Sequence, residues 1–175
     1  MLFRSREEAP DAALDALEIQ VGMTVADVGA GTGYYTARLA KRVGPNGKVY
    51  ATDIQPEMLG LLKKKKLANV ETVLGAADDP KLPALAMDLI LLVDVYHEFS
   101  QPQKMLQKMR EALKPEGRLV LLEFRKEDPN VPIRLEHKMS IAEARMELEA
   151  EGYRLEKVLE KLPWQHILIF RKKPA

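Results

Sequence analysis

The stretch that decides the fold of this 175-residue chain is Val25-Ala-Asp-Val-Gly-Ala-Gly-Thr-Gly-Tyr-Tyr-Thr36. Its first four residues form an apolar run typical of a buried strand, and Tyr34 to Val43 carry a helical pattern. Three glycines lie between the two. Glycine permits positive φ angles and lets a ligand lie against bare backbone, while the first amides of the following helix point at that ligand. The stretch therefore predicts a strand, a glycine turn and a helix that hold a nucleoside cofactor.

A second feature lies in register with this turn. Asp53 follows the next predicted strand, Lys48 to Thr52, and comes about twenty residues after Gly33. An acidic side chain at this place can accept hydrogen bonds from both hydroxyls of a ribose. The glycine turn and the acidic residue together favour a nucleoside site over an ordinary turn of an α/β protein.

The spacing of the glycines indicates which cofactor is bound. A dinucleotide fingerprint, Gly-x-Gly-x-x-Gly, uses its third glycine to pack helix against strand beneath a pyrophosphate. This chain has Gly-x-Gly-x-Gly, and the bulky Tyr34 stands where that third glycine is needed. The run Asp27-Val-Gly-Ala-Gly-Thr-Gly33, together with Asp53, resembles the S-adenosylmethionine (SAM) site of class I methyltransferases. The resemblance implies that SAM is the cofactor and S-adenosylhomocysteine the product.

The resemblance also implies roles for individual residues. In the family, the first acidic residue and the glycine turn hold the methionine end of the cofactor, and the second acidic residue holds the ribose. The segment Gly75-Ala-Ala-Asp-Asp79 resembles the family's adenine-binding segment, although the commoner spelling is Gly-Asp-Ala. Asp78 is expected to accept from the adenine amino group, with Asp79 as the alternative. The residues expected to bind the cofactor are Asp27, Gly29, Ala30, Gly31, Gly33, Tyr35, Asp53, Ile54, Ala77, Asp78 and Asp94.

The order of the predicted elements indicates an α/β fold. Helical patterns alternate with short apolar strands, and the chain closes with two strands joined at Pro163-Trp164. The predicted helices are residues 10–20, 35–43, 56–67, 102–113 and 140–152, and the predicted strands are residues 24–28, 48–52, 70–74, 87–93, 118–124, 153–162 and 165–171. The class I methyltransferase resemblance implies a seven-stranded, mostly parallel sheet of order 3-2-1-4-5-7-6, with strand 7 antiparallel and helices on both faces.

Length and composition predict a single domain over residues 1–175. A chain of this length with 46% hydrophobic residues can bury a sizeable core. Within it we expect an N-terminal helix in residues 1–20 and a candidate substrate loop at residues 125–139. No apolar run has the length of a membrane span, and the first ten residues lack the apolar region of a leader. A cytoplasmic protein is therefore expected.

Charge and cysteine content reduce the possible partners and the possible kinds of catalysis. The 27 basic and 26 acidic side chains nearly cancel, which disfavours nucleic acid as a partner. The chain has no cysteine, which excludes disulfides, thiolate catalysis and thiolate metal sites. The sequence permits a homodimer, but no specific residue supports one.

The polar residues expected to act in catalysis follow predicted strands, and ligands of an open α/β sheet bind beyond the carboxyl ends of its strands. The segment Asp94-Val-Tyr-His-Glu-Phe99 follows the fourth strand, a place that in the family lies beneath the transferable methyl group. His97 has a suitable pKa to take a proton from an acceptor, and Glu98 is expected to orient it or act in its place. We expect all three histidines to lie in loops at this rim. The residues expected to contact substrate are Tyr34, Tyr96, Glu123, His137, Trp164 and His166.

A metal site is the alternative use of this rim. Its residues include ligand types that bind zinc or iron, namely His97, Glu98, Glu123, His137 and His166. No short ligand spacing such as His-x-x-x-His is present. The expected site therefore has no metal ion.

The expected reaction is methyl transfer to a small molecule. Such transfer is an in-line displacement at a sulfonium carbon, and the enzyme's main task is to align the acceptor in a dry pocket. The runs Val28 to Gly33, Asp53 to Leu59 and Leu113 to Leu119 are most similar to the ubiquinone and menaquinone biosynthesis type of methyltransferase. No Asn-Pro-Pro-Tyr motif appears, which favours O- or C-methylation over transfer to nitrogen. The alternatives are an RNA or protein methyltransferase that works with a partner and a non-catalytic SAM-binding protein.

Overall fold

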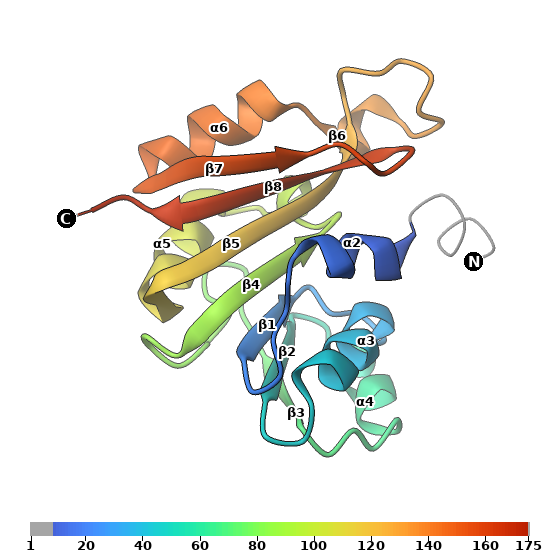
Figure 1. Ribbon diagram of the computed structural model, residues 1–175, viewed down its shortest axis with the longest axis vertical. Coiled ribbons are helices and arrows are strands. Elements are labelled where there is room, and N and C mark those ends of the chain that lie inside the picture. The colour runs from blue at the N-terminus through green and yellow to red at the C-terminus, as the bar shows by residue number, and fades with distance from the viewer. Residues whose placement is uncertain (1–8, 175) are drawn as a thin grey trace.

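The computed structural model describes residues 9–174, which form a twisted sheet with helices on both faces (Figure 1). The first eight residues of the predicted N-terminal helix region lie outside the described part. The helices are α2 (Pro10–Ala16), α3 (Tyr34–Val43), α4 (Pro56–Lys63), α5 (Pro102–Ala112) and α6 (Ile141–Ala150), with the short 3-10 helices η1 (Tyr96–Glu98) and η2 (Leu135–His137). The strands are β1 (Thr24–Val28), β2 (Lys48–Asp53), β3 (Val70–Leu74), β4 (Met87–Val93), β5 (Leu113–Arg125), β6 (Lys138–Met139), β7 (Tyr153–Leu159) and β8 (Gln165–Lys172).

The strand order confirms the predicted topology. The sheet runs β3-β2-β1-β4-β5-β8-β7, and β8 is antiparallel to both β5 and β7. The sheet has eight strands where the sequence analysis predicts seven. The additional strand, β6, is only two residues long and pairs with the end of β5 through Lys138 and Met139. A pair this short carries too little periodicity to be recognised in a sequence.

The two faces of the sheet bury separate apolar clusters. Side chains of α2 and α3 pack on one face, where Leu14 and Leu39 are fully buried. Side chains of α5 and α6 pack on the other face, where Leu106 and Leu148 are buried. β4 lies between β1 and β5 and contributes side chains to both clusters. This agrees with its almost uninterrupted apolar sequence, because a central parallel strand is covered on both faces.

Several predicted boundaries are wrong, each for a local reason. α2 ends at Ala16 instead of residue 20, and Glu18 just beyond it has a left-handed φ of 52°. α4 ends at Lys63 instead of residue 67, and Lys66 just beyond it has a left-handed φ of 51°. β5 begins at Leu113 instead of residue 118; a shift in the pairing with β4 accommodates the turn-forming residues 114–117 inside the strand.

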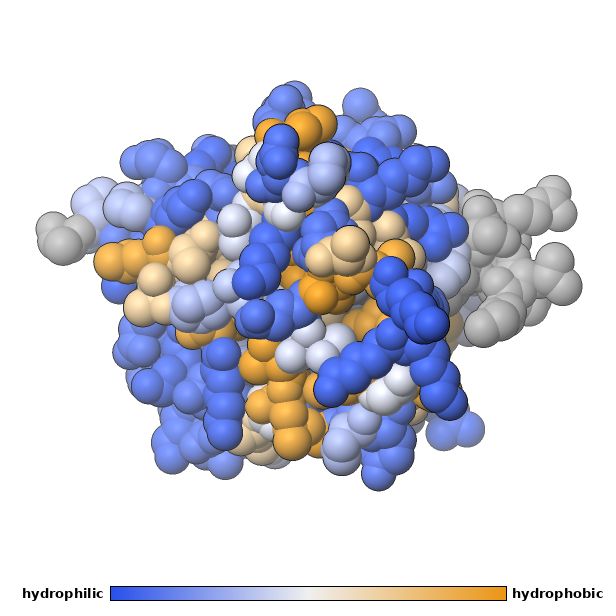
Figure 2. All heavy atoms as spheres, turned by 90° about the horizontal axis from the view of Figure 1, so that it is seen from below, coloured by the Kyte–Doolittle hydropathy of each residue, from blue (hydrophilic) through white to orange (hydrophobic). Residues whose placement is uncertain are grey.

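The sheet edge at β3 carries exposed apolar side chains. Seen from below, apolar side chains gather in the middle of this face and are flanked by hydrophilic ones (Figure 2). Leu61 of α4 and Leu74 of β3 are each about half exposed. Within residues 9–174, none of the helices has both the length and the apolar character needed to cross a bilayer.

Removal of one buried hydroxyl tests how α5 is joined to the second half of the sheet. The Tyr153 hydroxyl is buried and donates to the Leu106 carbonyl over 2.6 Å. Tyr153→Phe leaves that carbonyl without this donor, so we expect the free energy of unfolding to fall by about 1 to 2 kcal/mol in urea denaturation. Tyr50→Phe, on a half-buried ring, serves as the control with a smaller loss; equal losses in the two variants would contradict the prediction.

Candidate active site

The glycine turn between β1 and α3 is held against the end of β2. The Gly29 and Ala30 amides both donate to the Thr52 carbonyl, over 2.8 and 3.0 Å. Gly31 has a φ of +58°, and a Cβ atom added to it would meet nothing within 4 Å. Its side-chain position therefore opens onto free space, which allows a ligand to approach the backbone.

Asp53 is oriented by two backbone amides. Its Oδ2 accepts from the Gly31 amide and its Oδ1 from the Gln55 amide, each over 2.9 Å. The carboxylate is thus tied to the glycine turn on one side and to the start of α4 on the other. Charged hydrogen bonds of this kind fix a side chain well, and each oxygen keeps a lone pair for a further donor such as a hydroxyl.

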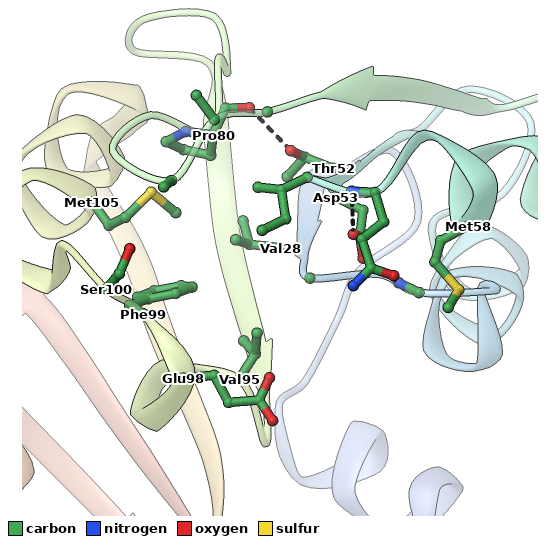
Figure 3. A pocket seen from close by; sticks show the side chains of 17 residues that line it. Val28, Thr52, Asp53, Met58, Pro80, Val95, Glu98, Phe99, Ser100 and Met105 are labelled. Carbon is green, nitrogen blue, oxygen red and sulfur yellow. Dashed lines mark hydrogen bonds between the residues drawn. The ribbon is translucent and has the colours of Figure 1, made fainter.

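A pocket of about 250 Å³ lies directly over these groups. In Figure 3, Asp53 and Met58 stand on one side of it, and Phe99 and Met105 face them from the other side. Thr52 closes the back with a hydrogen bond from its hydroxyl to the Pro80 carbonyl over 3.1 Å. The pocket therefore combines one oriented carboxylate with apolar walls, the usual make-up of a small-molecule site.

About half of the predicted cofactor residues line this pocket, together with one predicted catalytic residue. They are Gly29, Gly31, Asp53, Ile54, Ala77 and Glu98. The sequence does not predict the apolar wall that Met58, Val95, Phe99 and Met105 form. Three of these lie inside or next to segments that it singles out, so proximity to the motifs was the available signal; Met105 on α5 had none.

Asp27 is buried and lies outside the pocket lining. Its carboxylate is 2% exposed and accepts a hydrogen bond from the Thr36 hydroxyl over 2.7 Å. Burial raises the pKa of Asp27 from 3.8 to about 6, against the lowering effect of the Thr36 hydrogen bond; the nearby Asp53 adds a smaller upward contribution. Ionisation of this carboxyl group, at the start of the glycine turn, therefore costs free energy in the folded protein.

Asp94 begins the segment after β4 in a strained conformation. Its φ is 52°, which is left-handed, and its amide donates to the Leu122 carbonyl over 2.8 Å. The buried Gln165 of β8 donates its side-chain amide toward both carboxylate oxygens, at 3.0 and 2.8 Å. Gln165, which the sequence analysis does not single out, therefore ties the rim segment to the antiparallel strand.

Five other predicted residues do not line the pocket either. Tyr34 lies under the Arg38 guanidinium at 4.4 Å, and Tyr35 is buried in the core between α2, α3 and the sheet. Gly33 precedes α3 as its N-cap residue. Asp78 is half-buried in the loop after β3, and the Trp164 carbonyl accepts from the Arg125 amide over 3.0 Å.

His97 and Glu123 form a pair on the face of the sheet that α5 and α6 cover. The Nδ1 atom of His97 lies 2.9 Å from Oε2 of Glu123, whose side chain is completely buried. The hydrogen bond to this carboxylate raises the pKa of His97, although burial acts against it. Burial raises the pKa of Glu123, and the His97 hydrogen bond opposes that rise. The pair directs Nε2 of His97 away from the core.

The outward atom of His97 meets two other predicted residues. Nε2 lies 3.8 Å from Oε1 of Glu98, and the ring centroid lies 5.6 Å from that of His137. A second pocket, of about 290 Å³, adjoins them and is lined by Tyr96 and His97 of η1. It shares Phe99 with the first pocket.

The prediction that His166 lies in a loop is wrong. His166 is the second residue of β8 and is completely buried, because β8 begins immediately after Trp164. It pairs across the ladder with Glu123, so the two side chains lie on the same face of the sheet. Burial lowers its pKa, and neither ring nitrogen makes a hydrogen bond of normal geometry. His166 therefore lies in the core next to Glu123, the hydrogen-bond partner of His97.

The raised pKa of Asp27 leads to a test of stability against pH. Because the folded-state pKa is about 6 and the ordinary value is 3.8, the unfolded chain ionises first and stability falls as pH rises between these values. Asp27→Asn cannot ionise. We expect its stability relative to the unmodified protein to be greater at pH 7.5 than at pH 4.5 by about 2 kcal/mol, measured by urea denaturation. The same relative stability at both pH values would argue against the shift.

Comparisons with known proteins agree with this geometry. A family model described as a methyltransferase domain matches residues 19–168. The ubiquinone/menaquinone biosynthesis C-methyltransferase UbiE of Escherichia fergusonii is 35% identical over 118 residues, which cover 65% of this chain and 47% of that protein. The chain therefore spans about half the length of the curated relatives it matches.

Solved structures extend the similarity over nearly the whole chain. A SAM dependent methyltransferase from Aquifex aeolicus is 32% identical with a TM-score of 0.89, and the alignment covers 96% of this chain and 92% of that one. A putative type 11 methyltransferase from Sulfolobus solfataricus shares the fold at 22% identity, with a TM-score of 0.75 and coverage of 97% and 94%. From the family match, these relatives and a pocket built on the glycine turn, we conclude that the chain belongs to the class I SAM-dependent methyltransferases.

Proposed function

We propose that this chain transfers the methyl group of SAM to an oxygen or carbon atom of a small-molecule acceptor. The observation that carries the proposal is the pocket in which the glycine turn, Asp53 and Glu98 of η1 meet. The UbiE relative is a C-methyltransferase of quinone biosynthesis, which supports a small acceptor. A homodimer and a cytoplasmic location stay predictions.

The walls of the pocket suit the parts of the cofactor. The two oxygens of Asp53 are held 2.9 Å from backbone amides and are oriented to accept from the ribose hydroxyls. Ile54 and Met58 on one side, and Phe99 and Met105 on the other, offer apolar surface for the adenine ring. The open backbone at Gly31 leaves room for the methionine end. In this arrangement Asp27, which does not line the pocket, supports the glycine turn from the end of β1.

The acceptor is proposed to lie on the η1 side, near His97. In the transfer, the bond between the methyl carbon and the sulfonium sulfur breaks as a bond from that carbon to the acceptor forms, and S-adenosylhomocysteine leaves. When the acceptor must lose a proton, Nε2 of His97 accepts it, and Glu123 stabilises the resulting imidazolium through the 2.9 Å contact at Nδ1. Glu123 is completely buried and therefore acts as a positioning residue, without contact to substrate.

Loss of the Asp53 carboxylate tests the cofactor site. Asp53→Ala removes two charged hydrogen bonds within the protein and the proposed ribose contacts. We expect the dissociation constants of SAM and S-adenosylhomocysteine to rise by roughly 10- to 100-fold in calorimetric titrations. Glu57→Ala, on an exposed acidic residue in the first turn of α4, is the matched control and should bind as the unmodified protein does. Unchanged affinity in folded Asp53→Ala protein would contradict the assignment.

A pair of glycine variants separates backbone strain from occupation of the pocket. Gly22 and Gly31 both have positive φ, and neither has an atom within 4 Å of an added Cβ; of the two, only Gly31 lines the pocket. Alanine at either position should cost about 1 to 2 kcal/mol of stability. We expect Gly31→Ala also to weaken SAM binding by at least tenfold, because its methyl group occupies cofactor space, and Gly22→Ala to bind SAM normally. Equal affinities would place the cofactor elsewhere.

A further inference from the structure

Three side chains with metal-ligating atoms converge between η1 and η2. Each of His97, Glu98 and His137 offers one ligand atom, and these atoms all lie within 4.8 Å of one another. It is the one such group of three within residues 9–174. The group brings together the segment after β4 and the loop after β5, which are far apart in the sequence.

The ring of His97 is already oriented as a ligand. Its Nδ1 is hydrogen-bonded to the completely buried Glu123 over 2.9 Å, and its own side chain is only 11% exposed. A metal-bound histidine characteristically gives its other ring nitrogen to a carboxylate, which fixes the tautomer and makes the free nitrogen a better donor. Glu123 holds His97 in this way, and Nε2 faces the other two potential ligands.

The exposed side chains of Glu98 and His137 can rotate to bind an ion. Nε2 of His97 and Oε1 of Glu98 are 3.8 Å apart. Ligand bonds of about 2.0 to 2.2 Å to zinc place neighbouring ligand atoms roughly 3 to 3.5 Å apart in tetrahedral geometry. Glu98 and His137 both have exposed side chains, so small rotations of these two suffice, without movement of the buried Glu123.

The donor set selects the class of ion. Two imidazoles and one carboxylate favour zinc and related divalent transition metals over calcium or magnesium, which prefer oxygen ligands alone. Three protein ligands also leave a coordination position open for water or another oxygen. No metal is expected from the sequence, because the chain shows no short ligand spacing. The fold nevertheless brings the three side chains together from distant segments.

We propose that His97, Glu98 and His137 form a binding site for one Zn²⁺ ion that ties η2 to η1. Glu98 also lines the cofactor pocket, so the site adjoins that pocket. An ion held there suits an acceptor oxygen as its further ligand; this last point rests on the proposed function. Nε2 of His97 cannot take a proton while it binds the ion. Direct proton transfer to His97 therefore takes place only in the metal-free protein. In the zinc-bound protein, the acceptor oxygen binds the ion instead.

The test is calorimetric titration of the EDTA-stripped full chain with Zn²⁺, together with the absorption spectrum of the Co²⁺-substituted protein. We expect one equivalent to bind, visible Co²⁺ bands of a four- or five-coordinate site, and a melting temperature raised by roughly 5 to 10 °C at 100-fold excess over the dissociation constant. His137→Ala and Glu98→Gln change exposed side chains and should weaken binding by at least tenfold. Glu136→Gln, next to His137 in η2, is the matched control and should bind normally.

Two results would overturn the site. One is the absence of stoichiometric Zn²⁺ binding by the folded protein, and the other is equal binding by His137→Ala and the unmodified protein, since the ion would then be held elsewhere. SAM is titrated into the same samples. Normal SAM binding without Zn²⁺ binding refutes the metal site alone, whereas Zn²⁺ binding without SAM binding refutes the proposed cofactor site and leaves the metal site standing.

Discussion

The parallel pairing of β1 with β2 and β4 is the constraint on which the rest of the structure depends. Residues 24–28 align with residues 48–52 on one side, and residues 25–28 align with residues 89–92 on the other. Because parallel strands end at the same edge of a sheet, the segments that follow them meet there. The glycine turn, Asp53 and η1 come from three separate segments, and this shared register brings them to one pocket.

Buried ionisable groups gather around this edge and cost stability. Asp27, Glu123 and His166 are at most 2% exposed. Burial raises the pKa of the two carboxyl groups and lowers that of the histidine, which in each case favours the neutral form. A core designed for stability alone would carry apolar residues at these places. Their presence beside the cofactor pocket and the His97 cluster is the pattern expected where local stability is given up for function.

Predictions from the sequence agree with the structure where a local pattern lies at a strand end, and they are wrong where packing decides the position of a side chain. Asp53 and Gly31 follow two different strands, and a hydrogen bond joins them at the pocket, while their contact with the cofactor stays a prediction. Tyr35 follows the same glycine turn, but its ring turns into the core, because a helix residue next to the sheet packs where apolar surface is available. His166 is expected at the rim, although the predicted strand 165–171 already contains it; the structure buries it as the second residue of β8, because its side chain faces the packed interior.

Residue types at short, regular spacing are enough to predict the class of fold, the glycine turn and an acidic residue at position 53. The contacts by which Gln165 restrains Asp94, Glu123 orients His97, and His137 meets His97 and Glu98 follow from the tertiary structure instead. These contacts join residues far apart in the chain, and no periodicity encodes them. They exist because β8 inserts beside β5 and the loop after β5 returns to η1, which is a property of the whole sheet.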